Sequence, residues 1–215
     1  TTTASFSVDM AIGAVDGDTT GEAVNAIYGF QIDLNTSFTG EDSLDVSLDA
    51  GSSAASLDQL DLNSTTADAL TVDGVSYTFP LGDKTTVFVG DSMDGSTLYN
   101  TACVYGGQTI NIDDCGNSGA AMAAGMGTAA GASYDFGNGW TAALGYEGQG
   151  SDATAGLFTS EGTDVFGGQV TYTGDKYGVS LTYSDFEGTN DTAYTAFKAY
   201  YTPESAGSLP SISAG

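Results

Sequence analysis

The sequence contains no histidine and no arginine, and three lysines are its only basic side chains. Without an imidazole, a serine or cysteine nucleophile lacks its usual general base, and no nucleophile motif is present, so we expect no enzymatic activity. Without clusters of basic residues there is no clamp for phosphate groups. The 28 acidic residues give a net charge of −25, which makes nucleic acid a poor partner and cations good ones.

Long hydrophobic runs are missing as well. No stretch approaches the roughly 18 apolar residues that mark a transmembrane helix, which leaves a soluble protein or a β-barrel. A signal peptide is not recognisable, because Thr1 opens directly into polar alternating sequence, so we expect a mature chain or a fragment. The twelve tyrosines and ten phenylalanines indicate a folded chain.

Helical periodicity is scarce, and 31 glycines interrupt most windows of helical length. Alternation of apolar and polar residues with a period of two is frequent instead. In the first such segment, Phe6, Val8 and Met10 alternate with Ser7 and Asp9. Counted along the chain, this alternation predicts ten strands and a short eleventh near Ile212.

The predicted connections alternate between short and long. Tight turns with Gly, Asp or Asn follow the even-numbered strands, and longer polar loops follow the odd-numbered ones. Short turns on one side and long loops on the other are typical of an outer-membrane β-barrel, with the chain start on the periplasmic side. A soluble β-sandwich also alternates apolar and polar residues, but it gives no reason for this rhythm. The turns are predicted at 39–42, 80–84, 137–139, 174–176 and, somewhat longer, 203–209; the loops at 15–26, 51–69, 91–127, 148–163 and 185–192.

If the apolar side chains face lipid, the polar positions of the same strands line a lumen. Rings of acidic side chains favour the passage of cations, so we predict a wet channel that prefers cations. The other interpretation is an ordinary solvent-facing side of a half-buried sheet. The acidic residues predicted to line the lumen are Asp9, Asp33, Asp45, Asp49, Asp135 and Glu147.

The longest loop, 91–127, holds both cysteines of the chain and is expected to fold inward and narrow the pore. Cys103 and Cys115 are expected to form a local disulfide in an oxidising compartment. A zinc site is the rival interpretation, but structural zinc needs four N or S ligands, so we expect neither a metal site nor a cofactor. The acids of this constriction loop are Asp91, Asp94, Asp113 and Asp114.

Four segments carry a family resemblance: 102–117 around the cysteines, the turns 36–44 and 77–84, and the ending 209–213. They resemble cyanobacterial outer-membrane porins of the carbohydrate-selective, OprB-like type, often named iron-uptake porins. The turn sequences Phe-Thr-Gly-Glu-Asp and Phe-Pro-Leu-Gly-Asp-Lys are the most specific part of this similarity. It runs over nearly the whole chain.

The resemblance implies an all-β, antiparallel transmembrane barrel of about sixteen strands. It also implies passive uptake of small solutes and inorganic ions across the outer membrane, commonly by a homotrimer. An N-terminal periplasmic domain and further C-terminal strands belong to such proteins, so we expect residues 1–215 to be part of a single barrel domain. Because arginine is absent, the arginines that general porins set against acids across the constriction cannot be carried over.

A second function class stays open at this point. An acidic extracellular or surface-layer β-protein would bind calcium through loop carboxylates, for which Asp91, Asp94, Asp113 and Asp114 supply oxygens. No EF-hand loop or glycine-aspartate repeat supports this alternative.

Overall fold

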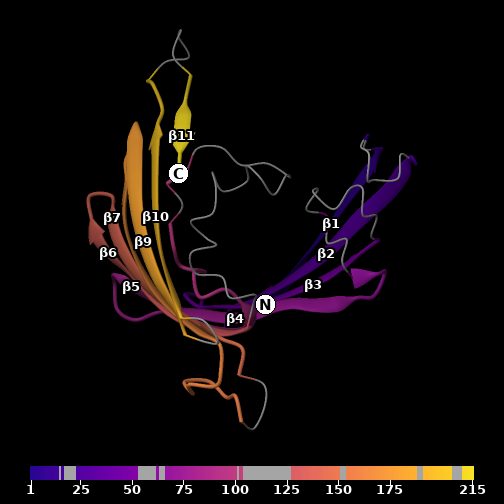
Figure 1. Ribbon diagram of the computed structural model, residues 1–215, viewed down its shortest axis with the longest axis horizontal. Coiled ribbons are helices and arrows are strands. Elements are labelled where there is room, and N and C mark those ends of the chain that lie inside the picture. Colours follow the sequence, from indigo (N-terminus) through magenta and orange to yellow (C-terminus); the bar gives the residue numbers. More distant parts are fainter. Residues whose placement is uncertain are drawn as a thin grey trace. The chain divides into compact units, whose positions relative to one another are not determined.

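The chain folds almost entirely into β-strands in the computed structural model, which describes residues 1–14, 16, 23–52, 62, 66–100, 102–103, 127–150, 154–187, 191–204 and 210–215. Eleven strands form one sheet in which each strand is a neighbour of the next in chain order, as Figure 1 shows. The strands are β1 (Thr2–Gly13), β2 (Asn25–Thr36), β3 (Ser43–Gly51), β4 (Thr71–Pro80), β5 (Thr85–Met93), β6 (Gly127–Gly137), β7 (Trp140–Gly148), β8 (Asp164–Thr173), β9 (Tyr177–Glu187), β10 (Thr192–Tyr201) and β11 (Ile212–Ala214).

The all-β, antiparallel prediction is confirmed, including the ten strands and the short eleventh. One predicted connection is wrong. β9 continues to Glu187 and β10 begins at Thr192, so the polar residues around 185, which looked like a loop, extend the strand. The connection 188–191 is therefore shorter than the one between β10 and β11, and the rhythm of short turns and long loops fails at this point.

Among the described residues, no helix is long and apolar enough to cross a membrane.

The described residues group into two compact units, divided within β4. One unit contains the described residues from Thr1 to Val75, and the other those from Ser76 to Gly215. Each unit has few buried apolar side chains. In the first, Ile27 packs on Leu62; in the second, Phe88 and Val165 are fully buried.

The first unit separates polar and apolar residues onto the two faces of its sheet. Residues paired across antiparallel strands point to the same face. The register joins Phe6 to Ile32 and Ile32 to Leu48, which makes one face apolar. The residues next to these in the chain point to the other face, which is polar, as the pairing of Asp33 with Ser47 shows.

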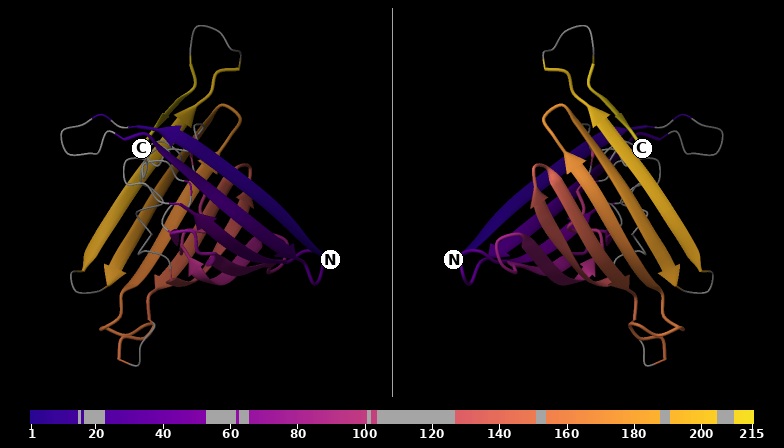
Figure 2. Two further views of the ribbon diagram at one scale, coloured as in Figure 1. Left: turned by 90° about the vertical axis from the view of Figure 1, so that its right-hand side faces the viewer. Right: turned by 90° about the vertical axis from the view of Figure 1, so that its left-hand side faces the viewer.

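The second unit shows the same alternation with an inverted burial pattern. Along β9, the apolar residues Val179, Leu181 and Tyr183 are exposed, whereas the polar residues between them are buried. Figure 2 shows β6–β10 side by side, with the connection between β7 and β8 extending beyond their ends. We use "apolar face" and "polar face" for the two sides of this sheet.

The short turn between β6 and β7 follows directly from its sequence. Gly137 pairs with Trp140, which leaves Asn138 and Gly139 as a two-residue hairpin loop. Both have positive φ, 55° and 84°, as a type I′ turn requires, and Asn-Gly is its preferred sequence. The confirmed turn fixes the register of β6 and β7, and with it the faces on which their side chains lie.

A second short turn, between β2 and β3, is held by one carboxylate. Asp42 Oδ1 accepts hydrogen bonds from the amides of Phe38 and Thr39 and from the hydroxyls of Ser37 and Thr39, at 2.7–3.0 Å. Gly40 in this turn has a φ of 94°, which favours glycine. The Phe-Thr-Gly-Glu-Asp sequence therefore has a structural role, because Phe38, Thr39 and Asp42 form hydrogen bonds that close the hairpin.

Candidate functional site

The polar face of the second unit is the most unusual surface of the described residues. Six of its polar side chains are at most 5% exposed, although they lie on only one layer of sheet. The register aligns them in rows across the strands: Thr171 pairs with Ser180, and Ser180 pairs with Lys198. The buried members are Gln169, Thr171, Ser180, Thr182, Ser184 and Lys198.

Gln169 is the centre of a hydrogen-bond network on this face. Its Nε2 donates to Thr182 Oγ1 at 3.0 Å, and its Oε1 accepts from Thr171 Oγ1 at 2.9 Å. The same Oε1 accepts from the backbone N–H of Asn100 at 2.8 Å. Because buried amides are costly when unpaired, the network fixes both the Gln169 rotamer and the segment that contains Asn100.

The segment that follows β5 lies against this polar face. Besides the contact at Gln169, Asn100 Nδ2 donates to Thr141 Oγ1 at 2.7 Å. At the other end, the backbone N–H of Gly95 donates to Glu147 Oε2 at 3.1 Å. The described part of the predicted constriction loop is thus attached to β7 and β8, and we name residues 94–100 the docked segment. Its effect on a pore stays a prediction.

A β-bulge directs the chain into this position. The register between β5 and β6 shifts between Gly90 and Met93, and Ser92 has a φ of 55°. Bulges bend a strand and re-aim the residues that follow. Asp94 comes next and starts a turn in which its carbonyl accepts from Thr97 N at 3.1 Å. The bulge explains why the chain leaves β5 toward the polar face.

Two ionisable groups of the docked segment are affected by burial. Burial raises the pKa of Asp94 above its ordinary value of 3.8, and burial also raises the pKa of Tyr99. Within the described part of the chain, the buried Tyr99 hydroxyl has no hydrogen-bond partner. Both shifts have the same cause, since the segment is pressed against the sheet and its charged forms lose water.

The disulfide prediction is supported at one of its two cysteines. Cys103 is disulfide-bonded, whereas Cys115, Asp113 and Asp114 lie outside the described residues. The remaining predicted loop acid, Asp91, lies within β5, and its Oδ1 accepts a hydrogen bond from Thr128 Oγ1 at 2.9 Å.

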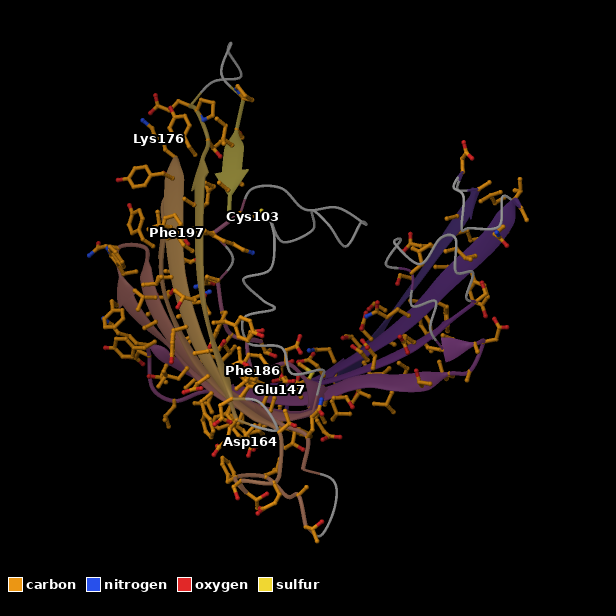
Figure 3. All side chains as sticks on the ribbon, in the orientation of Figure 1. Cys103, Glu147, Asp164, Lys176, Phe186 and Phe197 are labelled. Carbon is orange, nitrogen blue, oxygen red and sulfur yellow. The ribbon has the colours of Figure 1, made fainter. Side chains whose placement is uncertain are left out.

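Glu147 is fully buried at the end of β7. Figure 3 shows it at the same end of the strands as Asp164 and Phe186, with Lys176 at the opposite end. By register Glu147 shares the polar face with Val165 and Ala129. Its Oε2 accepts the hydrogen bond from Gly95, so this predicted lumen acid contacts the docked segment.

Asp135 lies on the polar face at the other end of β6, where it pairs with Thr141. Its Oδ1 accepts the amide of Gly137 at 2.7 Å, so this carboxylate also supports the Asn-Gly turn. Asp135 is exposed, in contrast to Glu147.

The first unit brings the other predicted acids onto one face. Asp33 Oδ1 accepts hydrogen bonds from Gln31 Nε2 at 2.9 Å and from Ser47 Oγ at 2.8 Å. Asp49 accepts from Thr71 Oγ1 at 2.6 Å. The register adds Asp45 through its pairing with Asn35 and Asp9 through its pairing with Gly29. The carboxylates therefore form an acidic, hydrogen-bonded surface.

Lys198 is a functional candidate that the sequence reasoning did not name. It is 1% exposed and lies on the polar face of β10 beside Ser180. The signal was present in the sequence, because Phe197 and Ala199 alternate with it and define the apolar face. Lysine is rarely buried to this degree, so this single cation matters for the charge of the polar face.

Across the described ranges, no group of three or more acidic, histidine or cysteine side chains is arranged to hold a metal ion.

No protein-family model matches this sequence, and no curated protein matches it at a significant level. The assignment of a function therefore depends on the geometry described above.

Proposed function

We propose that the protein is an outer-membrane porin through which small hydrophilic solutes and inorganic ions diffuse passively, with a preference for cations. In this proposal the sheet belongs to a closed barrel whose apolar face contacts lipid and whose polar face lines the lumen. A closed barrel is needed because open sheet edges are not tolerated in hydrocarbon.

The inverted burial pattern of β9 carries the proposal. Leu181 is 54% exposed while its neighbour Thr182 is completely buried. The same inversion continues in the adjacent strands, where Val170 is 49% and Phe197 is 60% exposed. An apolar face of this extent needs a partner, and no second sheet covers it among the described residues. Lipid is the partner that fits polar residues on the other face.

Conductance in a planar lipid bilayer tests the channel itself. We expect discrete, ohmic steps when the protein is added, and the absence of such steps would refute the proposal. Ser47 and Leu48 offer a matched pair, because they are adjacent in β3 and point to opposite faces. A charged thiol reagent should change the conductance of Ser47→Cys and leave that of Leu48→Cys unchanged. Equal responses would contradict the assignment of the two faces.

Reversal potentials in a salt gradient test the preference for cations. We expect the native channel to favour potassium over chloride, because the carboxylates of the first unit share one face. Asp33→Asn should reduce this preference, whereas Asp83→Asn, in an exposed turn, should not. A native reversal potential that favours chloride would remove the claim of cation preference without removing the porin.

A further inference from the structure

The connection between β7 and β8 carries an aromatic ring over the apolar face. Phe158, in the segment 154–163, stacks on Tyr146 with ring centroids 4.4 Å apart and planes inclined by 18°. Phe166 completes the cluster, 5.1 Å from Tyr146 and 6.4 Å from Phe158. Tyr146 and Phe166 are register partners on the apolar face. The connection thus returns to the apolar face of the sheet, opposite to the docked segment.

The backbone at Phe158 is held in an unfavourable conformation. Its φ is 61°, a left-handed value that bulky residues rarely adopt. The N–H of Phe158 donates to Asp164 Oδ2 at 3.0 Å, and the other oxygen of the same carboxylate accepts from the Tyr146 hydroxyl. Asp164 is 1% exposed. One buried carboxylate therefore fixes both the strained backbone and the ring beneath it.

The rest of the segment is fixed by its own hydrogen bonds. Thr159 N and Oγ1 both contact the carbonyl of Gly156, and Gly162 N donates to the carbonyl of Thr159 at 3.0 Å. Gln149 N donates to the carbonyl of Thr163 at 3.1 Å. These hydrogen bonds give the segment a defined backbone conformation, and this conformation sets the position of Phe158.

Despite these contacts, the Phe158 ring stays 69% exposed. A fold that holds a large apolar ring outward, against its backbone preference, indicates a partner for that ring. The place of the cluster identifies the partner. On one side it continues into the apolar face at Leu144, which is 70% exposed. On the other side Phe166 pairs with Asp185 in β9, where charged residues begin.

Aromatic rings at the border between an apolar band and charged residues are favoured in the headgroup region of a bilayer. We propose that the segment 154–163 is a membrane-surface anchor that places the Phe158 ring among the headgroups of the leaflet on the long-loop side. This inference rests on the proposed porin function, since it needs a protein whose apolar face contacts lipid.

Single-tryptophan fluorescence tests the anchor, because Trp140 is the only tryptophan. Trp140 lies on the apolar face, 46% exposed, at the short-turn end of β7. The native protein, through Trp140, therefore reports insertion at the border of the apolar face next to the short turns. The double variant Trp140→Phe/Phe158→Trp reports insertion at the opposite border, next to the connection between β7 and β8. Both are placed in phosphatidylcholine vesicles that carry bromine either near the headgroup or near the chain end. If the double variant does not fold, Phe158→Trp with Trp140 retained is used, and the native signal is subtracted.

We expect the tryptophan at position 158 to be quenched at least about twofold more by shallow than by deep bromine, as for an interfacial ring. Glu161→Trp in the same background is the matched control, since Glu161 is exposed in the same segment and outside the cluster; its quenching should be weak. Quenching of Glu161→Trp as strong as that at position 158 would overturn the anchor.

The remaining outcomes separate the two proposals. If native Trp140 is quenched but the tryptophan at position 158 is not, and the latter emits as in water, the anchor is wrong and the porin stands. If the tryptophan at position 158 emits as in an apolar environment but is not quenched by lipid bromine, a second copy of the chain covers it and the anchor is again wrong. If neither position is quenched, the protein is not in the bilayer, and the porin proposal falls together with the anchor.

Discussion

The attachment of the docked segment at Glu147 gives a prediction whose size follows from the structure. Glu147 is fully buried, and its Oε2 accepts the backbone N–H of Gly95 at 3.1 Å. Glu147→Ala removes that acceptor and leaves the Gly95 amide facing a space from which the sheet and the segment exclude water. The segment is then expected to open more often.

The magnitude comes from the buried N–H that loses its acceptor. A buried donor left without a partner costs about 1–3 kcal/mol. Since about 1.4 kcal/mol corresponds to a factor of ten, the opening equilibrium of the segment should rise about five- to 150-fold. Glu147→Gln retains a neutral acceptor and should give a smaller increase.

Amide hydrogen exchange measures this equilibrium without any assumption about transport. Exchange of peptides that cover residues 94–100 should accelerate by the factor given above in Glu147→Ala. Glu161→Ala, which removes an exposed carboxylate from another loop, should leave it unchanged. If Glu147→Ala exchanges within about twofold of the native rate, the buried hydrogen bond does not hold the segment, and the reasoning is refuted.

Three further predictions concern pH, a turn and charge. Burial raises the pKa of Asp94, so the docked segment is more stable when this carboxyl is protonated. Protection of the segment against amide hydrogen exchange should therefore be greatest at acid pH and weaken as the pH rises through that raised pKa. Asp94→Asn should abolish this pH dependence after correction for intrinsic exchange rates. Gly139→Ala brings a Cβ within 2.3 Å of the carbonyl oxygen that ends β8, whereas the Cβ of Gly137→Ala, at nearly the same φ, meets nothing within 4 Å. In urea unfolding, Gly139→Ala should lower the free energy of unfolding by at least about 1 kcal/mol more than Gly137→Ala does. Equal losses in the two variants would contradict the close approach. Lys198→Gln should shift the reversal potential further toward that of potassium, because it removes a buried cation from the polar face. Lys176 is half-exposed and ion-paired in a turn, so Lys176→Gln should leave the potential unchanged. An unchanged potential in Lys198→Gln would exclude Lys198 from the ion path.

Local patterns in the sequence predicted much of the fold. Alternation places Val179 and Leu181 on one face because successive strand residues point to opposite sides. The Asn138-Gly139 loop predicts a tight hairpin because both residues tolerate positive φ. Such signals act over a few residues, so they are readable without tertiary information. The same local reasoning ended β9 too early, because Asp185 and Glu187 are polar residues that nevertheless continue the strand.

Contacts between distant residues were beyond this kind of reasoning. Nothing in the sequence pairs Gly95 with Glu147 or Asn100 with Gln169, since 52 and 69 positions separate them. The acids predicted to line a lumen also look alike in the sequence, and only the folded chain gives them different surroundings. Glu147 is buried under the docked segment, whereas Asp135, on the same face, supports an exposed turn.

The sequence by itself determined that this chain is antiparallel β-sheet with one polar and one apolar face, because strand periodicity and turn chemistry are local properties of the backbone. Only the tertiary structure decided which face is covered. The bulge at Ser92 and the network at Gln169 bring the docked segment onto the polar side, and Asp164 holds Phe158 over the apolar side. Burial depends on which distant segments meet, and the side-chain hydrogen bonds that join them carry no signature along the chain.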